Sequence, residues 1–190
     1  MTQRSLPFRG GDHPIGVAML EGYIASSADG FVADTHGGVG FLDAYQDADF
    51  GYDAFLAQID GIVMGRATYD QIAGWDIPWP YPGTPCHVLT STDLIAPLEG
   101  VQRWSEGLAT YAAAMVDRTI WVLGGARLLA DCIAQGLMHR LQLFLIPVLL
   151  GRGVPLFPHD GPLVSLTLTA QMTHANGVVA LDYRLGRGDA

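Results

Sequence analysis

The chain has 190 residues, of which 49% are hydrophobic and 15% are charged, which is typical of one globular domain rather than of a disordered or fibrous protein. No apolar stretch approaches the roughly 20 residues that cross a bilayer, so no membrane partner is expected. The formal net charge is −9 and every basic residue is arginine, which argues against nucleic acid as a partner because nucleic acid requires a basic surface. A small anionic ligand is still compatible with this charge, since arginines and helix N-termini create local positive sites.

Residues 1–14 combine proline, glycine and mixed charge, and they lack the apolar core of a signal peptide. We therefore expect a flexible N-terminal arm, a single domain over residues 15–187 and a cytoplasmic location. Cys86 and Cys132 have no C-x-x-C partner, which predicts two buried thiols in a reducing compartment rather than a disulfide or a zinc site. The histidines form no H-x-x-x-H pair, so no metal site is expected.

The first half of the chain alternates short apolar runs with helical patterns. The first run closes on Asp29-Gly30, a dipeptide that suits a tight turn. Asp47 and Asp49 precede the first helical pattern, and either is a candidate N-cap. The elements expected up to residue 105 are a strand over 17–31, a glycine-rich loop over 36–46, a helix over 47–59, a strand over 61–65, a helix over 66–72, a proline-rich loop over 75–85, and strands over 87–92 and 101–105.

The second half continues the alternation and ends in two strand-like runs. Pro147 interrupts a long apolar run and demotes its far half to an edge or a bulge. The remaining expected elements are a helix over 107–116, a strand over 119–123, a helix that follows Gly125 and ends at 136–137, a strand over 140–150, and hairpin strands over 163–174 and 177–185. This order predicts an α/β fold with a single domain, whose mostly parallel central sheet is flanked by helices and ends in a C-terminal antiparallel hairpin.

Two strand-to-helix junctions have the same construction, GRAT at residues 65–68 and GGAR at residues 124–127. In α/β sheets, ligands bind beyond the carboxyl ends of the strands. Glycine lets the backbone approach a ligand there, and the next helix presents unpaired N–H groups that carry a partial positive charge. Each junction is therefore a candidate phosphate site, although glycine also serves tight turns that bind nothing. The G-x-G-x-x-G pattern of a Rossmann dehydrogenase is missing after the first strand, which disfavours that class.

Several segments, in order along residues 17–185, together resemble a known family. They are SADGFVA (27–33), IVMGRATY (62–69), VLGG (122–125), PVLLGRG (147–153) and LF (156–157). The combination resembles the dihydrofolate-reductase-like superfamily, and within it the branch that contains the reductase domain of the bifunctional riboflavin-pathway deaminase/reductase. The zinc-binding H-x-E and P-C-x-x-C motifs of the deaminase half are absent from this sequence.

This resemblance implies reduction by NADPH, with hydride passing from the nicotinamide to a small heterocyclic or carbonyl-like substrate. It places cofactor phosphates at both helix starts, and the adenosine side with its 2′-phosphate at the end of the strand over 87–92. The implied cofactor-binding residues are Gly65, Arg66 and Thr68 at the first helix start, Gly124, Gly125, Ala126 and Arg127 at the second, and Thr90, Ser91 and Thr92 on the adenosine side. Relatives carry an arginine on the adenosine side where this chain has hydroxyls, so a preference for NADPH over NADH rests largely on Arg66.

Two carboxylates are candidates for a catalytic role. The resemblance places Asp29 beside nicotinamide and substrate, whereas the residue pattern alone explains it as the first residue of an Asp-Gly turn. Members of the superfamily often hold the substrate ring with a carboxylate near the start of the first helix. This points to Asp49, for which an N-cap is the structural alternative. Asp43 and Asp53 stay open for the same role.

The walls of the site are expected to come from two loops. The loop over 36–46 and the Trp75–Trp79 segment are the candidates, because flat aromatic side chains stack on planar rings. Tryptophans in a proline-rich loop also commonly pack onto their own domain, which is the alternative for the second loop. His36 is the histidine in a suspected active-site loop, and it is at most a proton-donor candidate.

The function favoured at this point is an NADPH-dependent reductase similar to the riboflavin-pathway reductase domain, of the 5-amino-6-ribosylamino-pyrimidine type. Two alternatives stay open. One is dihydrofolate reductase proper, and the other is a nucleotide-binding module of the same fold without turnover. The expected partners are a small-molecule substrate and, by resemblance, a second copy of the chain in a homodimer.

Overall fold

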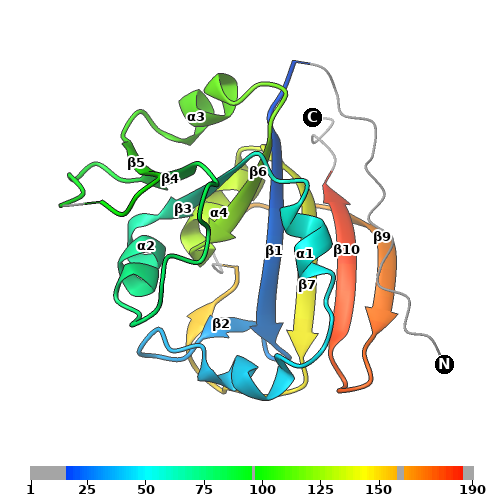
Figure 1. Ribbon diagram of the computed structural model, residues 1–190. Helices are drawn as coiled ribbons and strands as arrows, with labels where there is room; N and C mark the ends of the chain where they lie inside the picture. Colours follow the sequence, from blue (N-terminus) through cyan, green and yellow to red (C-terminus); the bar gives the residue numbers. More distant parts are fainter. Residues whose placement is uncertain (1–15, 96, 158–160, 186–190) are drawn as a thin grey trace.

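The centre of the protein is one eight-stranded sheet, seen in a computed structural model that describes residues 16–95, 97–157 and 161–185. In sheet order the strands are β5 (Val101–Trp104), β4 (Cys86–Leu89), β3 (Gly61–Gly65), β6 (Thr119–Gly124), β1 (Met19–Ser27), β7 (Met138–Ile146), β10 (Val179–Leu185) and β9 (Leu166–Thr173) (Figure 1). The strands from β5 to β7 in this order are parallel, and β10 and β9 follow as an antiparallel hairpin. The fold class predicted from the sequence is confirmed. The arm expected at residues 1–14 lies outside the described residues.

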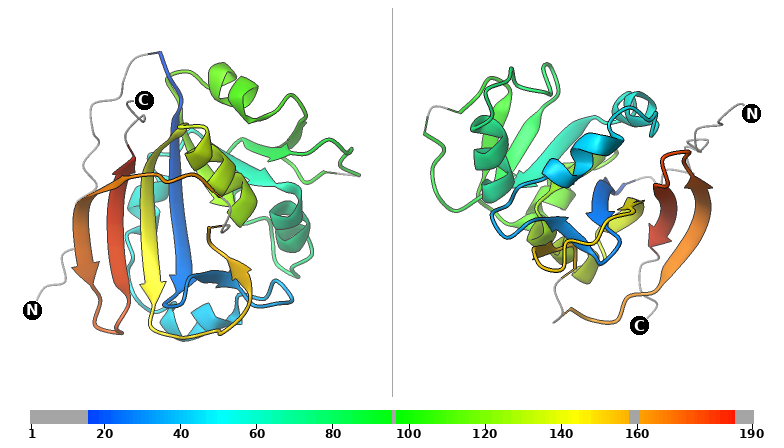
Figure 2. Two further views of the ribbon diagram at one scale, coloured as in Figure 1. Left: turned by 180° about the vertical axis from the view of Figure 1, so that it is seen from behind. Right: turned by 90° about the horizontal axis from the view of Figure 1, so that it is seen from below.

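Helices cover both faces of this sheet (Figure 2). One face packs against α1 (Tyr52–Leu56) and α2 (Arg66–Ala73), and the other against α3 (Leu108–Ala114) and α4 (Ala126–Ala134). A short 3₁₀ helix, η1 (Gly40–Tyr45), lies on the first face near the carboxyl end of β1, and the small strands β2 (Phe31–Ala33) and β8 (Val154–Pro155) pair beside that end (Figure 1). The carboxyl ends of the parallel strands are therefore surrounded by loops and helix starts.

The alternation of side chains along β3 shows why its sequence is apolar throughout. Ile62 and Met64 pack towards α1 and α2, whereas Val63 packs towards α3 and α4, and all three side chains are fully buried. Successive side chains of a strand point to opposite faces, so a strand covered on both sides needs a continuous apolar run. Cys86 and Cys132 are both buried in these cores, as predicted.

The helix predicted over residues 47–59 is much shorter than expected. It begins at Tyr52, and its N-cap is Gly51. The φ of Gly51 is 77°, a left-handed backbone conformation that a right-handed helix running through residue 51 cannot contain. Neither aspartate caps the helix, because Asp49 instead accepts a hydrogen bond from the backbone N–H of Gly51 through Oδ1, at 2.8 Å. The prediction that Asp47 or Asp49 caps this helix is therefore wrong.

Three strand predictions also needed correction. The run over 17–31 forms β1 and β2, separated by a turn at Asp29-Gly30 in which the N–H of Gly30 donates to the carbonyl of Ser27. The strand expected over 140–150 ends at Ile146, immediately before Pro147, so the half expected as an edge or a bulge is not part of β7, which lies between β1 and β10. The hairpin is confirmed, but its first strand starts at Leu166 rather than at residue 163.

Within the described parts of the chain, no helix combines the length and the apolar character needed to cross a bilayer.

Candidate functional site

The two glycine junctions lie side by side. β3 and β6 are parallel neighbours, with Met64 opposite Gly124, so α2 and α4 begin next to each other. A Cβ atom on Gly65 would lie 3.8 Å from the backbone nitrogen of Gly125. A Cβ atom on Gly125 would lie 3.3 Å from Oγ1 of Thr68, and the peptide bond between Gly124 and Gly125 is cis. The two junctions predicted separately from the sequence therefore form one site.

This site has the properties of a phosphate site. The N-caps of α2 and α4 are Gly65 and Gly125, which have no side-chain oxygen to accept hydrogen bonds from the first-turn N–H groups. Those N–H groups stay available to an external acceptor, and each helix start adds a partial positive charge. The tight spacing at Gly125 also means that any larger side chain would fill the space between the two helix starts. The residues present therefore fit the pyrophosphate of a dinucleotide.

Arg66 contacts the segment predicted to bind the adenosine side of the cofactor. Its Nε donates to both carboxylate oxygens of Asp70, at 2.7 and 2.8 Å, and its Nη1 donates to Oγ1 of Thr92 at 3.0 Å and to the carbonyl of Asp93 at 3.2 Å. The hydroxyl oxygens of Thr90 and Thr92 are 3.1 Å apart. The structure thus brings Arg66 and the hydroxyls that follow β4 into one cluster at the start of α2.

A second arginine, Arg103 of β5, reaches the same cluster and was missed by sequence reasoning. Its Nη1 donates to the carbonyl of Ser91 at 3.2 Å and forms an ion pair with Asp93 at 3.4 Å. β4 and β5 are parallel, with Val88 opposite Arg103, which carries this side chain to the end of β4. The only signal in the sequence is an arginine in a short strand, and that signal does not say which strand is its neighbour.

A cleft of about 680 Å³ opens on the face that carries α1. Its floor is aromatic: the ring centroids of Tyr23 and Phe144 are 4.6 Å apart, and those of Phe144 and Phe50 are 5.5 Å apart. Ala25 is paired with Phe144 across β1 and β7 and also lines the cleft. The residues that line the cleft are Tyr23, Ala25, Leu42, Tyr45, Gln46, Ala48, Asp49, Phe50, Tyr52, Asp53, Phe144 and Ile146. This size and lining suit a small planar ligand.

The cleft floor and the glycine junctions lie at the same end of the sheet. Pairing between the parallel strands β1 and β6 runs from Met19–Thr119 to Gly22–Val122. Beyond this pairing, β1 runs on to Ser27 and β6 to Gly124 towards the same carboxyl edge of the sheet. A ligand whose phosphates lie at the helix starts therefore has the cleft at the neighbouring strand end.

The structure separates the two carboxylates predicted to be catalytic. Asp49 lines the cleft together with Asp53, whereas Asp29 is not part of its lining. Asp29 accepts hydrogen bonds from the hydroxyl of Ser27 at 2.6 Å and from the backbone N–H groups of Leu150 at 3.1 Å and Gly151 at 2.7 Å. The hydrogen bond from Ser27 is the main cause that holds the pKa of Asp29 below its usual value. Asp29 thus ties the turn after β1 to the loop after β7.

The two loops expected to form the walls of the site lie differently with respect to this cleft. The loop over 36–46 contributes Leu42 and Tyr45 to the cleft. The tryptophan loop does not line it, and Trp79 packs edge-on against the rings of Tyr69 and Tyr81, which agrees with the alternative that this tryptophan packs onto its own domain. A large flat ring packs onto its own domain whenever aromatic neighbours are available to it.

The remaining candidates lie away from the cleft. His36 is exposed, and its backbone N–H donates to Asp34. Asp43 accepts a hydrogen bond from the side chain of Gln46 at 3.2 Å and is not among the lining residues. Among the residues that the structure describes, no group of three or more His, Cys, Asp and Glu side chains is arranged to hold a metal ion.

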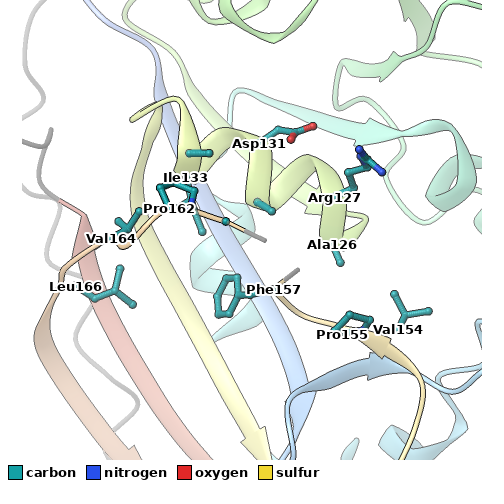
Figure 3. A pocket seen from close by; sticks show the side chains of 13 residues that line it. Ala126, Arg127, Asp131, Ile133, Val154, Pro155, Phe157, Pro162, Val164 and Leu166 are labelled. Atoms are coloured by element: carbon teal, nitrogen blue, oxygen red, sulfur yellow. The ribbon is translucent and has the colours of Figure 1, made fainter. Parts of the chain in front are cut away.

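A second cleft, of about 640 Å³, lies between α4 and residues of the segments 154–157 and 161–166 (Figure 3). Arg127 and Ala126 line it beside Asp131, with Phe157 on the other side. Arg127 thus contributes to this second cleft as well as standing in the first turn of α4, and its contact with a pyrophosphate stays a prediction.

Comparison with known proteins found related sequences. The family model for the RibD C-terminal domain matches residues 104–180. The chain is 32% identical over 139 residues to the uncharacterized protein YwjB of Bacillus subtilis (strain 168), a match that covers 71% of this chain and 80% of YwjB.

Two solved structures extend the comparison to the whole fold. A putative riboflavin biosynthesis protein from Shewanella sp. PV-4 superposes with a TM-score of 0.78 at 25% identity, covering 90% of this chain and 99% of that one. Dihydrofolate reductase from Enterococcus faecalis, complexed with NADP(H) and RAB-propyl, superposes with a TM-score of 0.62 at 18% identity, covering 88% of this chain and 96% of that one. The second likeness concerns the fold alone.

Proposed function

The chain belongs to the RibD C-terminal domain family of dihydrofolate-reductase-like fold, and on that premise we propose that it is an NADPH-dependent reductase of a small heterocyclic or carbonyl-like substrate. The observation that carries the proposal is the meeting of two glycine-capped helix starts at one place, with Thr68 between them. A homodimer belongs to the same proposal, and sedimentation velocity tests it.

In this proposal the glycine junctions hold the cofactor. The first-turn N–H groups of α2 and α4 and the hydroxyl of Thr68 bind the pyrophosphate, and the cluster after β4 binds the adenosine end. Arg66 and Arg103 supply the positive charge that a 2′-phosphate requires, and Thr90 and Thr92 supply hydroxyl donors. Asp70 and Asp93 are each paired with one of these arginines and offset part of their charge.

The cleft beside β1 is the substrate site in this proposal. When bound, NADPH supplies the hydride, so the chain has to orient two rings at close distance and keep water out. Tyr23 and Phe144, whose rings are tilted by 49° to each other, give an aromatic floor, and Leu42 and Tyr45 of η1 line the cleft beside it. Asp49 and Asp53 are placed to accept hydrogen bonds from the substrate and to fix its orientation.

The adenosine cluster is tested with Arg66→Ala. We expect the variant to bind NADPH about tenfold more weakly, because a charge-assisted hydrogen bond is lost, while NADH binding changes little. Isothermal titration with both cofactors measures this. Arg118→Ala is the matched control, since Arg118 is exposed and forms a 3.7 Å ion pair with Asp60 at the far end of β6. Equal losses for NADPH and NADH would show that Arg66 does not contact the 2′-phosphate.

Turnover is tested by the loss of NADPH absorbance with pterins, pyrimidines and quinones, next to a melting scan with NADPH and NADH. Stabilisation by cofactor together with oxidation of NADPH by one substrate class supports the reductase. Stabilisation without turnover on any of them would instead favour the nucleotide-binding module. If neither NADPH nor NADH stabilised the protein, both the reductase and the nucleotide-binding module would be contradicted.

A further inference from the structure

The two arginines of the adenosine cluster, Arg66 and Arg103, are each paired with a carboxylate. Nε of Arg66 donates to both carboxylate oxygens of Asp70, at 2.7 and 2.8 Å. Nη1 of Arg103 lies 3.4 Å from a carboxylate oxygen of Asp93. The formal charges of these four side chains cancel, so together they offer hydrogen-bond donors and acceptors without a net positive charge.

The two ion pairs differ in how well they are screened by solvent. Arg66 and Asp70 stand at positions i and i+4 of α2, on the same face of the helix, and their side chains are 36% and 52% exposed. Asp93 is 88% exposed and is placed at a longer distance from its arginine, so water and salt screen this second pair more strongly. Asp70 is therefore the carboxylate that compensates the cluster most effectively.

Arg66 is also held from its other side. Its Nη1 donates to Oγ1 of Thr92 at 3.0 Å and to the carbonyl of Asp93 at 3.2 Å. With Asp70 on Nε, the guanidinium group is held between α2 and the segment that follows β4. A phosphate that took over the Nε donor would have to displace the carboxylate of Asp70.

NADPH and NADH present different groups to this cluster. NADPH carries a 2′-phosphate with about two negative charges near neutral pH, which accepts hydrogen bonds, whereas NADH has a 2′-hydroxyl, which both donates and accepts. A phosphate beside Arg66 is attracted by the guanidinium group and repelled by Asp70 at a similar distance, so the two effects largely cancel. A hydroxyl can donate to Asp70 and accept from Thr92. These contacts give NADPH only a small advantage.

Resting on the proposed reductase function, we infer that Asp70 is a specificity-determining residue for the cofactor and that the protein accepts NADH as well as NADPH. Asp70 compensates the charge of Arg66 and offers an acceptor to the 2′-hydroxyl of NADH. Arg66 still supplies donors to the 2′-phosphate, and this remaining advantage of NADPH is the one that Arg66→Ala removes. The affinities of the unmodified protein for the two cofactors then differ by about tenfold or less.

The test is isothermal titration of the full chain with NADPH and with NADH, without a substrate. We expect the two affinities of the unmodified protein to lie within about tenfold of each other. Asp70→Asn keeps the size of the side chain and removes its charge, so NADPH should bind at least about fivefold more tightly, whereas NADH should bind no more tightly. A larger preference for NADPH in the unmodified protein, or an NADPH affinity that does not rise in Asp70→Asn, would overturn the inference.

Two further variants separate this role from a general effect of charge. Asp70→Glu keeps a carboxylate on the same face of α2, and its ratio of NADPH to NADH affinity should stay close to that of the unmodified protein. Asp76→Asn removes the same charge at an exposed position beyond the C-terminal end of α2, and it should leave both affinities unchanged. A gain of NADPH affinity in Asp76→Asn as large as that in Asp70→Asn would overturn the assignment to Asp70.

This inference and the reductase proposal fail in different ways. If neither cofactor bound to the unmodified protein, the reductase would be contradicted, and the inference with it. If both cofactors bound and Asp70→Asn did not change the ratio of their affinities, only the role of Asp70 would be overturned.

Discussion

At the scale of single residues, the two glycines between β6 and α4 are needed for different reasons. Gly124 has a φ of 138°, a backbone conformation that residues with side chains rarely adopt. Gly125 has an ordinary φ of −71°, so a turn alone would accept another residue there. Space is tight at Gly125, because a Cβ atom would lie 3.3 Å from Oγ1 of Thr68 and that side chain would have to shift. A tight turn therefore explains Gly124, whereas Gly125 is explained by its close approach to Thr68.

Gly125→Val tests this close approach directly. The branched side chain would fill the space between the helix starts of α2 and α4, so NADPH affinity should fall by about 100-fold, equivalent to ~2.7 kcal/mol, while the protein stays folded. Isothermal titration measures the affinity, and circular dichroism checks the fold. Gly40→Val, at an exposed glycine whose Cβ would meet only Asp43 at 3.7 Å, should bind NADPH normally. If Gly125→Val bound NADPH with unchanged affinity, the pyrophosphate would not bind between the starts of α2 and α4.

At the scale of elements, Asp29 joins two loops that are distant in sequence. Its carboxylate accepts N–H groups from Leu150 and Gly151 in the loop after β7, while it belongs to the turn between β1 and β2. These bonds, together with the hydroxyl of Ser27, lower its pKa in the folded state. The contribution to stability is therefore fully present above the unfolded pKa of about 3.9, and it is lost as the pH falls through the lower folded-state pKa.

We expect Asp29→Asn to melt a few degrees below the unmodified protein at pH 7. Asparagine has one accepting oxygen and one donating NH₂ group, so it cannot accept the three hydrogen bonds that the two oxygens of Asp29 accept. The gap should narrow below about pH 4, where the carboxylate of the unmodified protein also becomes protonated. Melting curves between pH 3 and 7 measure it. Asp76→Asn, at an exposed position, is the control. The difference between its melting temperature and that of the unmodified protein should be the same at every pH. If the difference in melting temperature between Asp29→Asn and the unmodified protein did not change with pH, the charge of the Asp29 carboxylate would not be what joins the two loops.

Elements were predictable from sequence where glycine or proline marked their ends. Pro147 correctly indicated that the apolar run changes there, and the glycines at 65 and 124–125 correctly marked helix starts. The first helix was overestimated because a left-handed Gly51 interrupts a pattern that is apolar at helical spacing on both sides. Hydrophobic spacing reports which residues are buried, and it does not report the backbone conformation of one glycine.

The site was predictable only in part for a related reason. Residues close to the glycine motifs, such as Thr68, were found because they share a helix start with them. Arg103 and the floor residues Tyr23 and Phe144 were not found, because their role depends on which strands are neighbours in the sheet. Alternation along a strand says which face a residue is on, but it does not give the order of strands.

At the scale of the whole molecule, one buried arginine connects the parallel sheet to the terminal hairpin. Arg140 of β7 donates through Nε and Nη2 to Asp182 of β10, at 2.9 and 2.6 Å, and its Nη1 is 3.7 Å from Glu21 of β1. Their side chains are 14%, 8% and 7% exposed, respectively, so all three charges are largely removed from water. The three strands are consecutive in the sheet, and the charges meet where the sheet changes from parallel to antiparallel.

Removing this arginine should destabilise the whole fold. Arg140→Met removes the cation that donates to the buried carboxylate of Asp182, and we expect a loss of about 3–5 kcal/mol in the free energy of unfolding, measured by urea denaturation. Arg184→Met is the matched control, because Arg184 pairs with Arg140 in the strand register but is exposed, and its loss should stay within about 0.5 kcal/mol. Adding Asp182→Leu to Arg140→Met should recover part of the loss, since one uncompensated charge is then gone. If Arg140→Met cost less than about 1 kcal/mol, the hairpin would be held to the sheet by its backbone and apolar contacts rather than by this ion pair.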